Sequence, residues 1–542
     1  MLLLMPALLI SACARVKSAR RARIERHLEV AKVFESREPY STRTIGDSAL
    51  SHFLAKNAEY RADSADITDF YAERHNQFAW ILGDSISENA EAFVALSGVD
   101  DSQSPSATKG TRRLSALYNR GIDEGKLIPL CDSCATELEL RLTGEYYRYV
   151  NRTNAGDLKH DLNTIIPAAK RDYGRLLDSL VANKMDLEGY EPANPQYKLL
   201  KEQVQKYSKF ANTPWPALEF PAGKKRIKVG DSTAVVSDIG ARLRILGDLE
   251  KTTDSTTQRY DTAMATGVKH FQSRHGMHPD GVIDSDFLNA LNISPVDRIR
   301  TMLVNMERMR WSGDARPANL LRVNIPEFRL HVIQDSAEVL TMDVVVGARG
   351  THTTIFSDTM TTIVMSPPWD VPSSIVHKEV LPGIAKNANY LAKHDMQIIG
   401  GSKDDPQVRQ MPGATNSLGR VKFLFPNSFD IYMHDTPAKS LFDNEDRAAS
   451  HGCIRLAHAE QLADFLLKDD SNWPPDKIHD AMFSGNTQMV KLAHAWPVSI
   501  EYFTAWVDRD GTLQFRNDVY GHDASLAGEL FSARQAAATP AQ

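Results

Sequence analysis

The sequence lacks an excess of positive charge, since its formal net charge at pH 7 is −6. This balance argues against a nucleic-acid-binding protein that relies on a broad basic surface. A local basic cluster at residues 17–26 is interpreted as a solvated tether. Signs of overall disorder are also missing, because 42% of the residues are hydrophobic and 24% are charged, as in ordinary globular proteins. At 542 residues the chain is too long for one core and is expected to form about three folding units.

The apolar stretch at residues 1–13 is too short to cross a bilayer as a helix, which needs about 20 residues. It is interpreted as a secretory signal. Its end, Ile10-Ser11-Ala12-Cys13, resembles a bacterial lipoprotein cleavage box, in which Cys13 becomes the lipidated first residue. No Lys or Arg precedes the stretch, so a plain signal peptide or a misassigned start codon stays open. We expect a periplasmic protein held at a membrane only through this lipid or signal.

Cys131 and Cys134 form a C-x-x-C pair, which an oxidising compartment would bridge. Such a pair can also be a redox site or half of a zinc site. The sequence has no second C-x-x-C and no thioredoxin-like surroundings. A small structural disulfide is therefore favoured, no metal site is expected, and Cys453 would remain a free thiol.

A thiol, a histidine and a cation occur together in Ser450-His451-Gly452-Cys453-Ile454-Arg455, and His434 lies nineteen positions before Cys453. A cysteine attacks as the thiolate, and neighbouring positive groups favour that form. Such a neighbourhood suits acyl transfer. The alternative is a buried, inert cysteine that has histidines nearby by chance.

The surrounding pattern resembles the active-site signature of the L,D-transpeptidases, the YkuD-like cysteine enzymes that cross-link bacterial peptidoglycan. The resemblance rests on the segments 431–437 and 450–456 and extends to residues 367–372, 410–413, 416–419, 421–423, 425–427, 504–508 and 519–521. It implies a multidomain α+β protein of the large Gram-negative type.

Four parts are expected after the signal at residues 1–13. They are a helical scaffold domain (14–225), a small three-helix peptidoglycan-binding-like domain (226–295), a mainly β catalytic domain (299–542) and, inside it, a helical capping insertion (about 374–429). Helical periodicity at 138–150, 157–183 and 197–210 supports the first, and alternating runs at 321–325 and 328–332 support the third. Whether the small domain binds glycan or only acts as a rigid support stays open.

Matching positions implies that Cys453 is the nucleophile and His434 the general base, with Asp435 orienting the imidazole through its backbone carbonyl. Backbone N–H groups near Gly452 and Cys453 are the expected oxyanion donors, each worth about 3–4 kcal/mol in studied enzymes. The further supporting candidates are Arg455 for a substrate carboxylate, Tyr432 for a hydroxyl, Ser450 and His451 for the turn, and Trp369 for the cleft. Each has a structural alternative, such as an ion pair for Arg455 or a core position for Trp369.

The resemblance implies that Cys453 attacks the L-to-D bond of a tetrapeptide stem, that D-Ala leaves, and that an amine of a second stem resolves the thioester into a 3-3 cross-link. No cofactor is expected. Peptidoglycan stems would be donor and acceptor, other cell-wall synthesis proteins are candidate partners, and carbapenems should acylate Cys453. The alternatives are a hydrolase of the same fold, which trims stems or detaches lipoproteins, and a non-catalytic peptidoglycan-binding lipoprotein.

Overall fold

The computed structural model describes residues 38–39, 41–82, 85–87, 90, 93–94, 109–123, 126–127, 131–152, 169–170, 195–250, 257–311, 317–403, 405–425, 427 and 431–531. The expected lipidation site Cys13 lies outside them. The predicted helix at 157–183 is described only at Ala169–Lys170, which form strand β6 and pair with β1 (Glu38–Pro39). The helix prediction is therefore wrong at these two residues. Across the described ranges, no helix combines the length and apolarity that a membrane span requires.

The N-terminal unit is mainly helical, as its apolar periodicity predicts. Its helices are α2 (Asp47–Lys56), η1 (Ala58–Asp63), α3 (Ser64–Glu73), α5 (Lys109–Gly121) and α6 (Asp132–Arg152). A small sheet has the order β2 (Ile81–Leu82), β3 (Ser85–Ile86), β5 (Lys126–Leu127), β4 (Ile122–Asp123). Phe70, Tyr71 and Trp80 are buried in the core of this unit.

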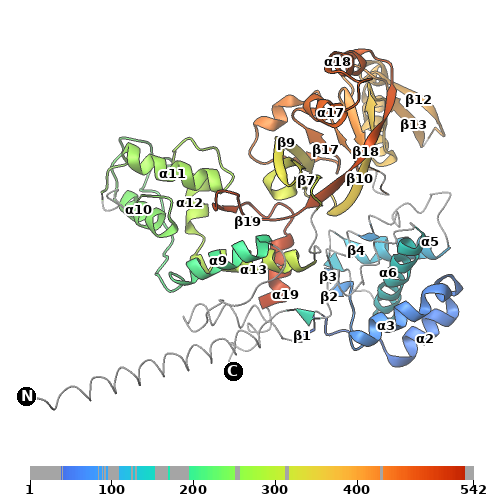
Figure 1. The fold of residues 1–542 in the computed structure, drawn as a ribbon, viewed down its shortest axis with the longest axis horizontal. Helices are drawn as coiled ribbons and strands as arrows, with labels where there is room; N and C mark the ends of the chain where they lie inside the picture. Colours follow the sequence, from blue (N-terminus) through green and yellow to red (C-terminus); the bar gives the residue numbers. More distant parts are fainter. Residues whose placement is uncertain are drawn as a thin grey trace, which may run out of the picture.

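Three short helices form the next unit, drawn in green in Figure 1: α10 (Val235–Leu246), α11 (Thr262–Arg274) and α12 (Ser285–Asn292). Asp261 and Asp284 cap α11 and α12 by accepting a backbone hydrogen bond in the first turn. At the end of α11 the imidazole of His275 stacks on Phe271 and also on Phe515 of a C-terminal hairpin. The expected three-helix fold is confirmed, and the end of α11 packs against the C-terminal hairpin through His275.

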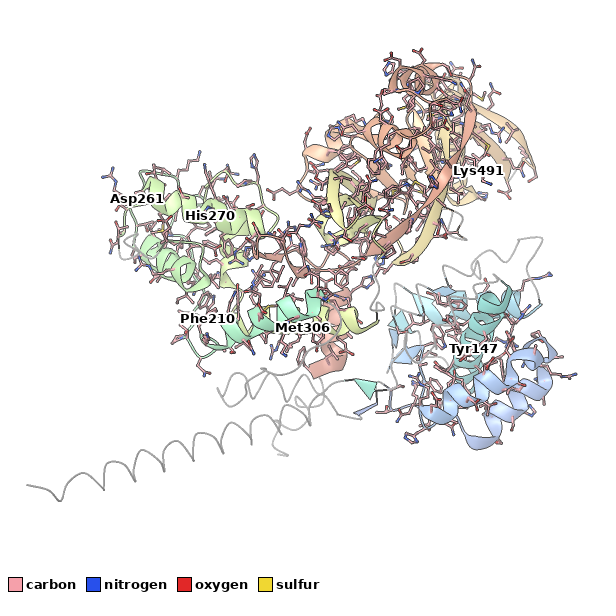
Figure 2. All side chains as sticks on the ribbon, viewed as in Figure 1. Tyr147, Phe210, Asp261, His270, Met306 and Lys491 are labelled. Carbon is pink, nitrogen blue, oxygen red and sulfur yellow. A yellow bond between two sulfur atoms is a disulfide. The ribbon has the colours of Figure 1, made fainter. Side chains whose placement is uncertain are left out.

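A central layer joins segments that are far apart in the sequence. It contains α9 (Pro195–Ser208), α13 (Pro295–Trp311), the hairpin β19 (Ala505–Val507) and β20 (Leu513–Phe515), and α19 (His522–Phe531). Met306 of α13 is buried in this layer, and Phe210, just after α9, packs against it (Figure 2). Although α9 falls within the predicted scaffold range 14–225, its core contacts are therefore made with this layer.

The unit predicted to be the catalytic domain, called the catalytic unit below, is built on one mixed nine-stranded sheet. Its order is β16 (Ala448–Ser450), β9 (Ala337–Gly347), β17 (Ile454–Leu456), β15 (Met433–His434), β14 (Val421–Leu424), β10 (Phe356–Met365), β18 (Gln488–Glu501), β7 (Leu320–Asn324), β8 (Arg329–Gln334). Because β8 also pairs with β9, the sheet closes on itself. Helices α17 (Ala459–Leu467) and α18 (Pro475–Phe483) pack on its core, with short turns η2 (Ile325–Glu327) and η4 (Lys439–Asp443) beside it. The mainly β prediction is confirmed, and Figure 1 shows β18 running from this sheet toward β19.

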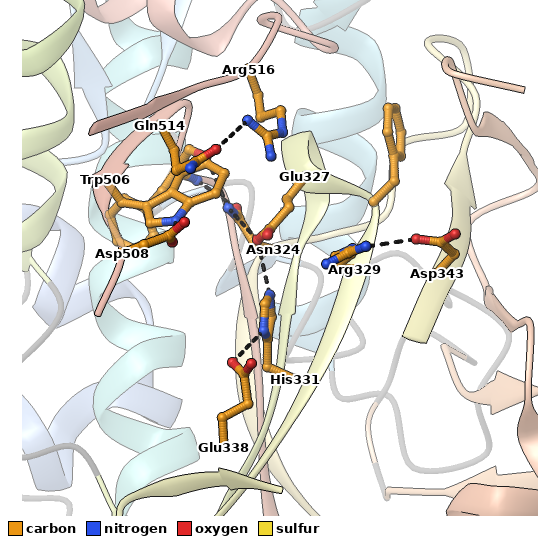
Figure 3. A network of polar contacts seen from close by, with 12 residues as sticks. Asn324, Glu327, Arg329, His331, Glu338, Asp343, Trp506, Asp508, Gln514 and Arg516 are labelled. Carbon is orange, nitrogen blue, oxygen red and sulfur yellow. Dashed lines mark hydrogen bonds and ion pairs between the residues drawn. The ribbon is translucent and has the colours of Figure 1, made fainter. Parts of the chain in front are cut away.

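A buried polar network lies where β8 of this sheet meets the β19–β20 hairpin (Figure 3). The two ring nitrogens of His331 lie 2.9 Å from Glu327 and 2.7 Å from Glu338. Burial by itself lowers the pKa of His331, but the bonds to both carboxylates outweigh burial and raise it. The imidazolium form is thus favoured inside the fold.

The capping insertion, defined here as residues 369–416, leaves the sheet after β10 and returns at β14. It contains β11 (Trp369–Asp370), α14 (Ser373–Ile375), the π-helix η3 (Val376–Val380), α15 (Leu381–Lys386), α16 (Tyr390–Lys393), β12 (Met396–Gly401) and β13 (Pro406–Gln410). The expected helices are present, but its strands also form a separate sheet in the order β11-β13-β12. Strand β14, which lies inside the predicted range 374–429, belongs to the main sheet.

Candidate active site

Strands β15 and β17 bring the predicted nucleophile and base to one face of the sheet. The two strands are parallel, with His434 opposite Arg455 and Met433 opposite Ile454. Met433 and Ile454 are fully buried in the core. Because successive side chains of a strand point to opposite faces, His434 and Arg455 lie on the other face. Cys453 directly precedes Ile454, so the same alternation directs it toward the face of His434 and Arg455.

His434 is buried and held as a neutral base. Burial is the largest cause that lowers its pKa, to about 3, and the charges of Arg455 and Lys422 act in the same direction. Its Nδ1 lies 2.5 Å from the backbone oxygen of Asp435, which can only accept, so Nδ1 carries the proton. Nε2 is therefore the nitrogen that can take a proton from a nucleophile.

Asp435 contacts His434 through its backbone oxygen, which is the contact that its predicted orienting role requires. Its carboxylate is engaged elsewhere: Oδ1 accepts from Lys439 Nζ at 2.7 Å, and Oδ2 from the backbone N–H of Arg420 at 2.9 Å. Gly419, which has a positive φ of 63°, lets this carboxylate approach, because a Cβ there would overlap it. The side chain thus fixes the loop that positions the carbonyl.

The turn 450–453 carries Cys453, the predicted nucleophile, and is held by Ser450. The Ser450 hydroxyl donates to the backbone oxygen of Cys453 at 2.6 Å and accepts from the backbone N–H of Gly452 at 3.1 Å. Gly452 has a φ of 118°, a conformation that favours glycine. The Gly452 N–H is thus occupied, so its predicted oxyanion role is not available in this conformation. The reason is that a local hydroxyl satisfies the donor first.

Two threonines after β9, which the sequence interpretation missed, support this turn from behind. The Thr353 hydroxyl donates to the Gly452 carbonyl at 2.7 Å and accepts from the Gly347 N–H at 2.8 Å. The Thr351 hydroxyl donates to the Ser450 carbonyl at 2.8 Å. The Tyr520 hydroxyl donates to the Gly347 carbonyl at 2.7 Å. The family resemblance at 519–521 includes Tyr520, and it was the sequence signal that pointed to the support of this turn.

Arg455 is a partly buried cation beside the base and the thiol. Its Nε is buried and has no hydrogen-bond partner in the described part of the chain. Burial lowers the pKa of its guanidinium, and interaction with Cys453 opposes that effect. A partly buried cation stabilises a neighbouring thiolate and attracts an anionic group.

Lys422 is a second cation beside the base, because it lies opposite His434 on β14. Its Nζ lies 3.7 Å from the centre of the Tyr432 ring, and the Tyr432 and His434 rings are 5.6 Å apart. Tyr432 therefore supports a cation with its ring face. Lys422 and Arg455 flank the base on the two adjacent strands.

The other predicted residues lie at different places. His451 binds Glu379 of the capping insertion, with Nε2 and Oε1 3.0 Å apart. Trp369 is half-buried and packs against the core of that insertion. Cys131 and Cys134 form a disulfide at the start of α6, in the N-terminal unit. Within the described ranges no group of three or more His, Cys, Asp or Glu residues could hold a metal ion.

Three parts of the chain match known domain families. Residues 318–479 match the L,D-transpeptidase catalytic domain (YkuD), residues 65–204 match a scaffold domain, and residues 232–291 match the family described as "Putative peptidoglycan binding domain". A Haemophilus influenzae protein named "Putative L,D-transpeptidase" is 31% identical over 241 residues, which cover 42% of this chain and 48% of that protein. The chain thus spans about half the length of this curated relative.

Among solved structures, an L,D-transpeptidase from Mycobacterium smegmatis is 14% identical and covers 34% of this chain and 58% of its own, with a TM-score of 0.19. An L,D-transpeptidase from Stackebrandtia nassauensis is 14% identical and covers 54% and 100%, with a TM-score of 0.21. At these TM-scores the structural similarities do not bear on function. The domain matches do, and they identify a multidomain protein with a YkuD-type L,D-transpeptidase catalytic domain, a scaffold domain and a domain of the peptidoglycan-binding family.

Proposed function

We propose that this protein is a cysteine L,D-transpeptidase of peptidoglycan. The observation that carries the proposal is the neutral, buried His434, whose Nδ1 is held by a carbonyl and which lies beside Arg455 on the face to which Cys453 is directed. A neutral imidazole can take the thiol proton as the sulfur attacks a carbonyl carbon.

In the first step, Cys453 attacks the carbonyl between the position-3 diamino acid and the terminal D-Ala of a tetrapeptide stem. The S–C bond forms, His434 takes the thiol proton, and the tetrahedral oxyanion collapses. The C–N bond then breaks, and His434 returns its proton to the amine of the leaving D-Ala. A thioester on Cys453 remains.

In the second step, an amine of another stem's diamino acid attacks the thioester carbon. His434 takes a proton from this amine, the C–S bond breaks, and the thiol is regenerated. The product is a 3-3 cross-link, and no redox change or cofactor is needed. Arg455 supports both steps, since its charge favours the thiolate and its guanidinium can bind a carboxylate of the stem.

A hydrolase of the same fold would share the first step and use water in the second. The chain would act at the cell wall of the periplasm, tethered by lipid on Cys13, with the small helical domain near the glycan. Other cell-wall synthesis proteins would be its partners, and carbapenems would acylate Cys453 by the same attack on a carbonyl.

The test compares purified protein and its Cys453→Ala variant on disaccharide tetrapeptide, with products identified by mass spectrometry. A Cys453-dependent dimer that has lost one D-Ala is expected. Tripeptide alone would replace the transferase by the hydrolase, and absence of any Cys453-dependent product would refute both.

A further inference from the structure

The π-helix η3 presents one residue of the capping insertion to the catalytic turn. Val376 and Val380 at its two ends are buried in the core of the insertion, whereas the three residues between them are exposed. π-helices are rare and occur frequently at functional sites. In η3 the buried residues pack the helix against the core of the insertion. Its exposed residues, which include Glu379, can contact other parts of the chain.

Asp405 contacts this helix and the segment before it within the insertion. Its Oδ1 accepts a hydrogen bond from the Ser373 hydroxyl at 3.0 Å and lies 3.1 Å from His377 Nε2. Asp405 directly precedes β13, which pairs with β12 and β11. Val376 and Val380 also share one buried core with Val408 of β13, so Glu379 would move with the insertion as a unit.

Glu379 reaches out of the insertion to His451, at 3.0 Å. His451 is followed directly by Gly452 and Cys453, in the turn that Ser450 holds. Of the hydrogen bonds and ion pairs that residues 373–395 make in the described structure, this is the one that leaves the insertion. It joins two chain segments that are separated by 72 positions.

The contact between Glu379 and His451 is exposed and therefore weak. The side chains of His451 and Glu379 are 51% and 52% exposed. Exposed ion pairs are weak, so this one favours contact over separation by only a few-fold. Such a contact can form and break as a peptide enters and leaves.

We propose that the Glu379–His451 contact couples the capping insertion to the turn that carries Cys453, with Glu379 as a positioning residue. Its catalytic consequence rests on the proposed function, whereas the coupling itself can be measured without substrate. When the contact breaks, both the insertion and the turn should become more mobile.

The experiment measures backbone amide hydrogen exchange by mass spectrometry in the full chain, comparing wild type with Glu379→Ala. Exchange in peptides covering 373–401 and 448–453 should rise about two- to fivefold, because the lost pair is an exposed one. Glu379→Gln, which keeps an amide oxygen within reach, should restore part of the protection. The single-turnover rate of Cys453 acylation by saturating tetrapeptide should fall about two- to fivefold, with the melting temperature within about 1 °C of wild type.

Glu460→Ala is the matched control. Glu460 pairs with His479 between α17 and α18 at 2.8 Å, with 41% and 56% of the side chains exposed. This variant should leave exchange at 373–401 and 448–453 unchanged. Unchanged exchange in Glu379→Ala, or an equal rise in Glu460→Ala, would overturn the coupling. If exchange responds as expected but wild type acts on no stem peptide, the proposed function fails and the coupling stands.

Discussion

Replacing Thr353 with valine should loosen the turn that carries Cys453. The Thr353 hydroxyl serves two buried backbone groups, the Gly452 carbonyl at 2.7 Å and the Gly347 N–H at 2.8 Å, and the residue is 1% exposed. Valine has nearly the same shape, so the substitution removes the hydrogen bonds while leaving the packing in place. Each buried group left without a partner costs about 1–3 kcal/mol, which gives about 2–4 kcal/mol for the two when some relaxation is allowed.

The consequence for stability can be measured by thermal unfolding. For a domain of about 150–250 residues, 1 kcal/mol shifts the melting temperature by about 2–4 °C, so Thr353→Val should lower the transition of the catalytic unit by about 4–16 °C. The acylation rate should fall about tenfold or more, because the displaced turn stabilises the transition state less. A loss of about 1.4 kcal/mol of this stabilisation already slows the reaction tenfold. Thr353→Ser, which keeps the hydroxyl, should recover most of both losses.

Thr362→Val on β10 is the control. The Thr362 hydroxyl has one contact, to Thr361 at 3.4 Å, and the residue is only partly buried. Its replacement should shift the transition by less than about 2 °C. A Thr353→Val protein that unfolds and is acylated like Thr362→Val would refute the conclusion that this hydroxyl holds the turn.

Three further predictions concern the turn, the cation and the buried imidazolium. Gly452→Ala forces a side chain into a φ of 118°, which costs about 1–3 kcal/mol, so we expect a lower melting temperature and loss of Cys453 acylation; a fully active variant would contradict the strain argument. Arg455→Ala removes the charge that attracts the Cys453 thiolate, so alkylation of Cys453 by iodoacetamide at pH 7 should slow about tenfold or more, and an unchanged rate would exclude that role. The pKa of His331 is raised on folding, so its stabilising effect is complete below about pH 6.5 and is lost as pH rises through the folded value. In urea titrations His331→Gln should therefore flatten the decline in unfolding free energy as the pH rises above about 6.5, and an equally steep decline would refute this assignment.

The elements that were predicted well depend on short-range pattern. The three helices at 235–292, with aspartate caps before two of them, follow from apolar spacing and from capping chemistry within one turn. The strands β7 and β8 follow from the alternation of apolar and polar residues at 321–325 and 328–332. The backbone role of Asp435 followed from the general need of a catalytic histidine for an acceptor.

The misses depend on contacts that the sequence pattern does not show. The small sheet of the capping insertion was not predicted, because its β12 strand carries exposed residues such as Ile398 and gives no amphipathic signal. The Gly452 N–H was assigned to an oxyanion, since a sequence does not show that the Ser450 hydroxyl turns back onto it. Thr353 and Glu379 were not singled out, because each meets the catalytic turn from a position 72–99 residues away.

The sequence by itself determined which chemistry we propose for this chain and the types of its domains. The sequence alone shows the spacing of a thiol, a histidine and an arginine. It also shows the helical and strand periodicities, because these are local patterns. Only the tertiary structure decided that His434 is neutral, that the Gly452 N–H is occupied, and that the capping insertion touches the catalytic turn. The physical reason is that burial, the direction of a hydrogen bond and contact between distant segments arise only when the sheet has closed and water has been excluded.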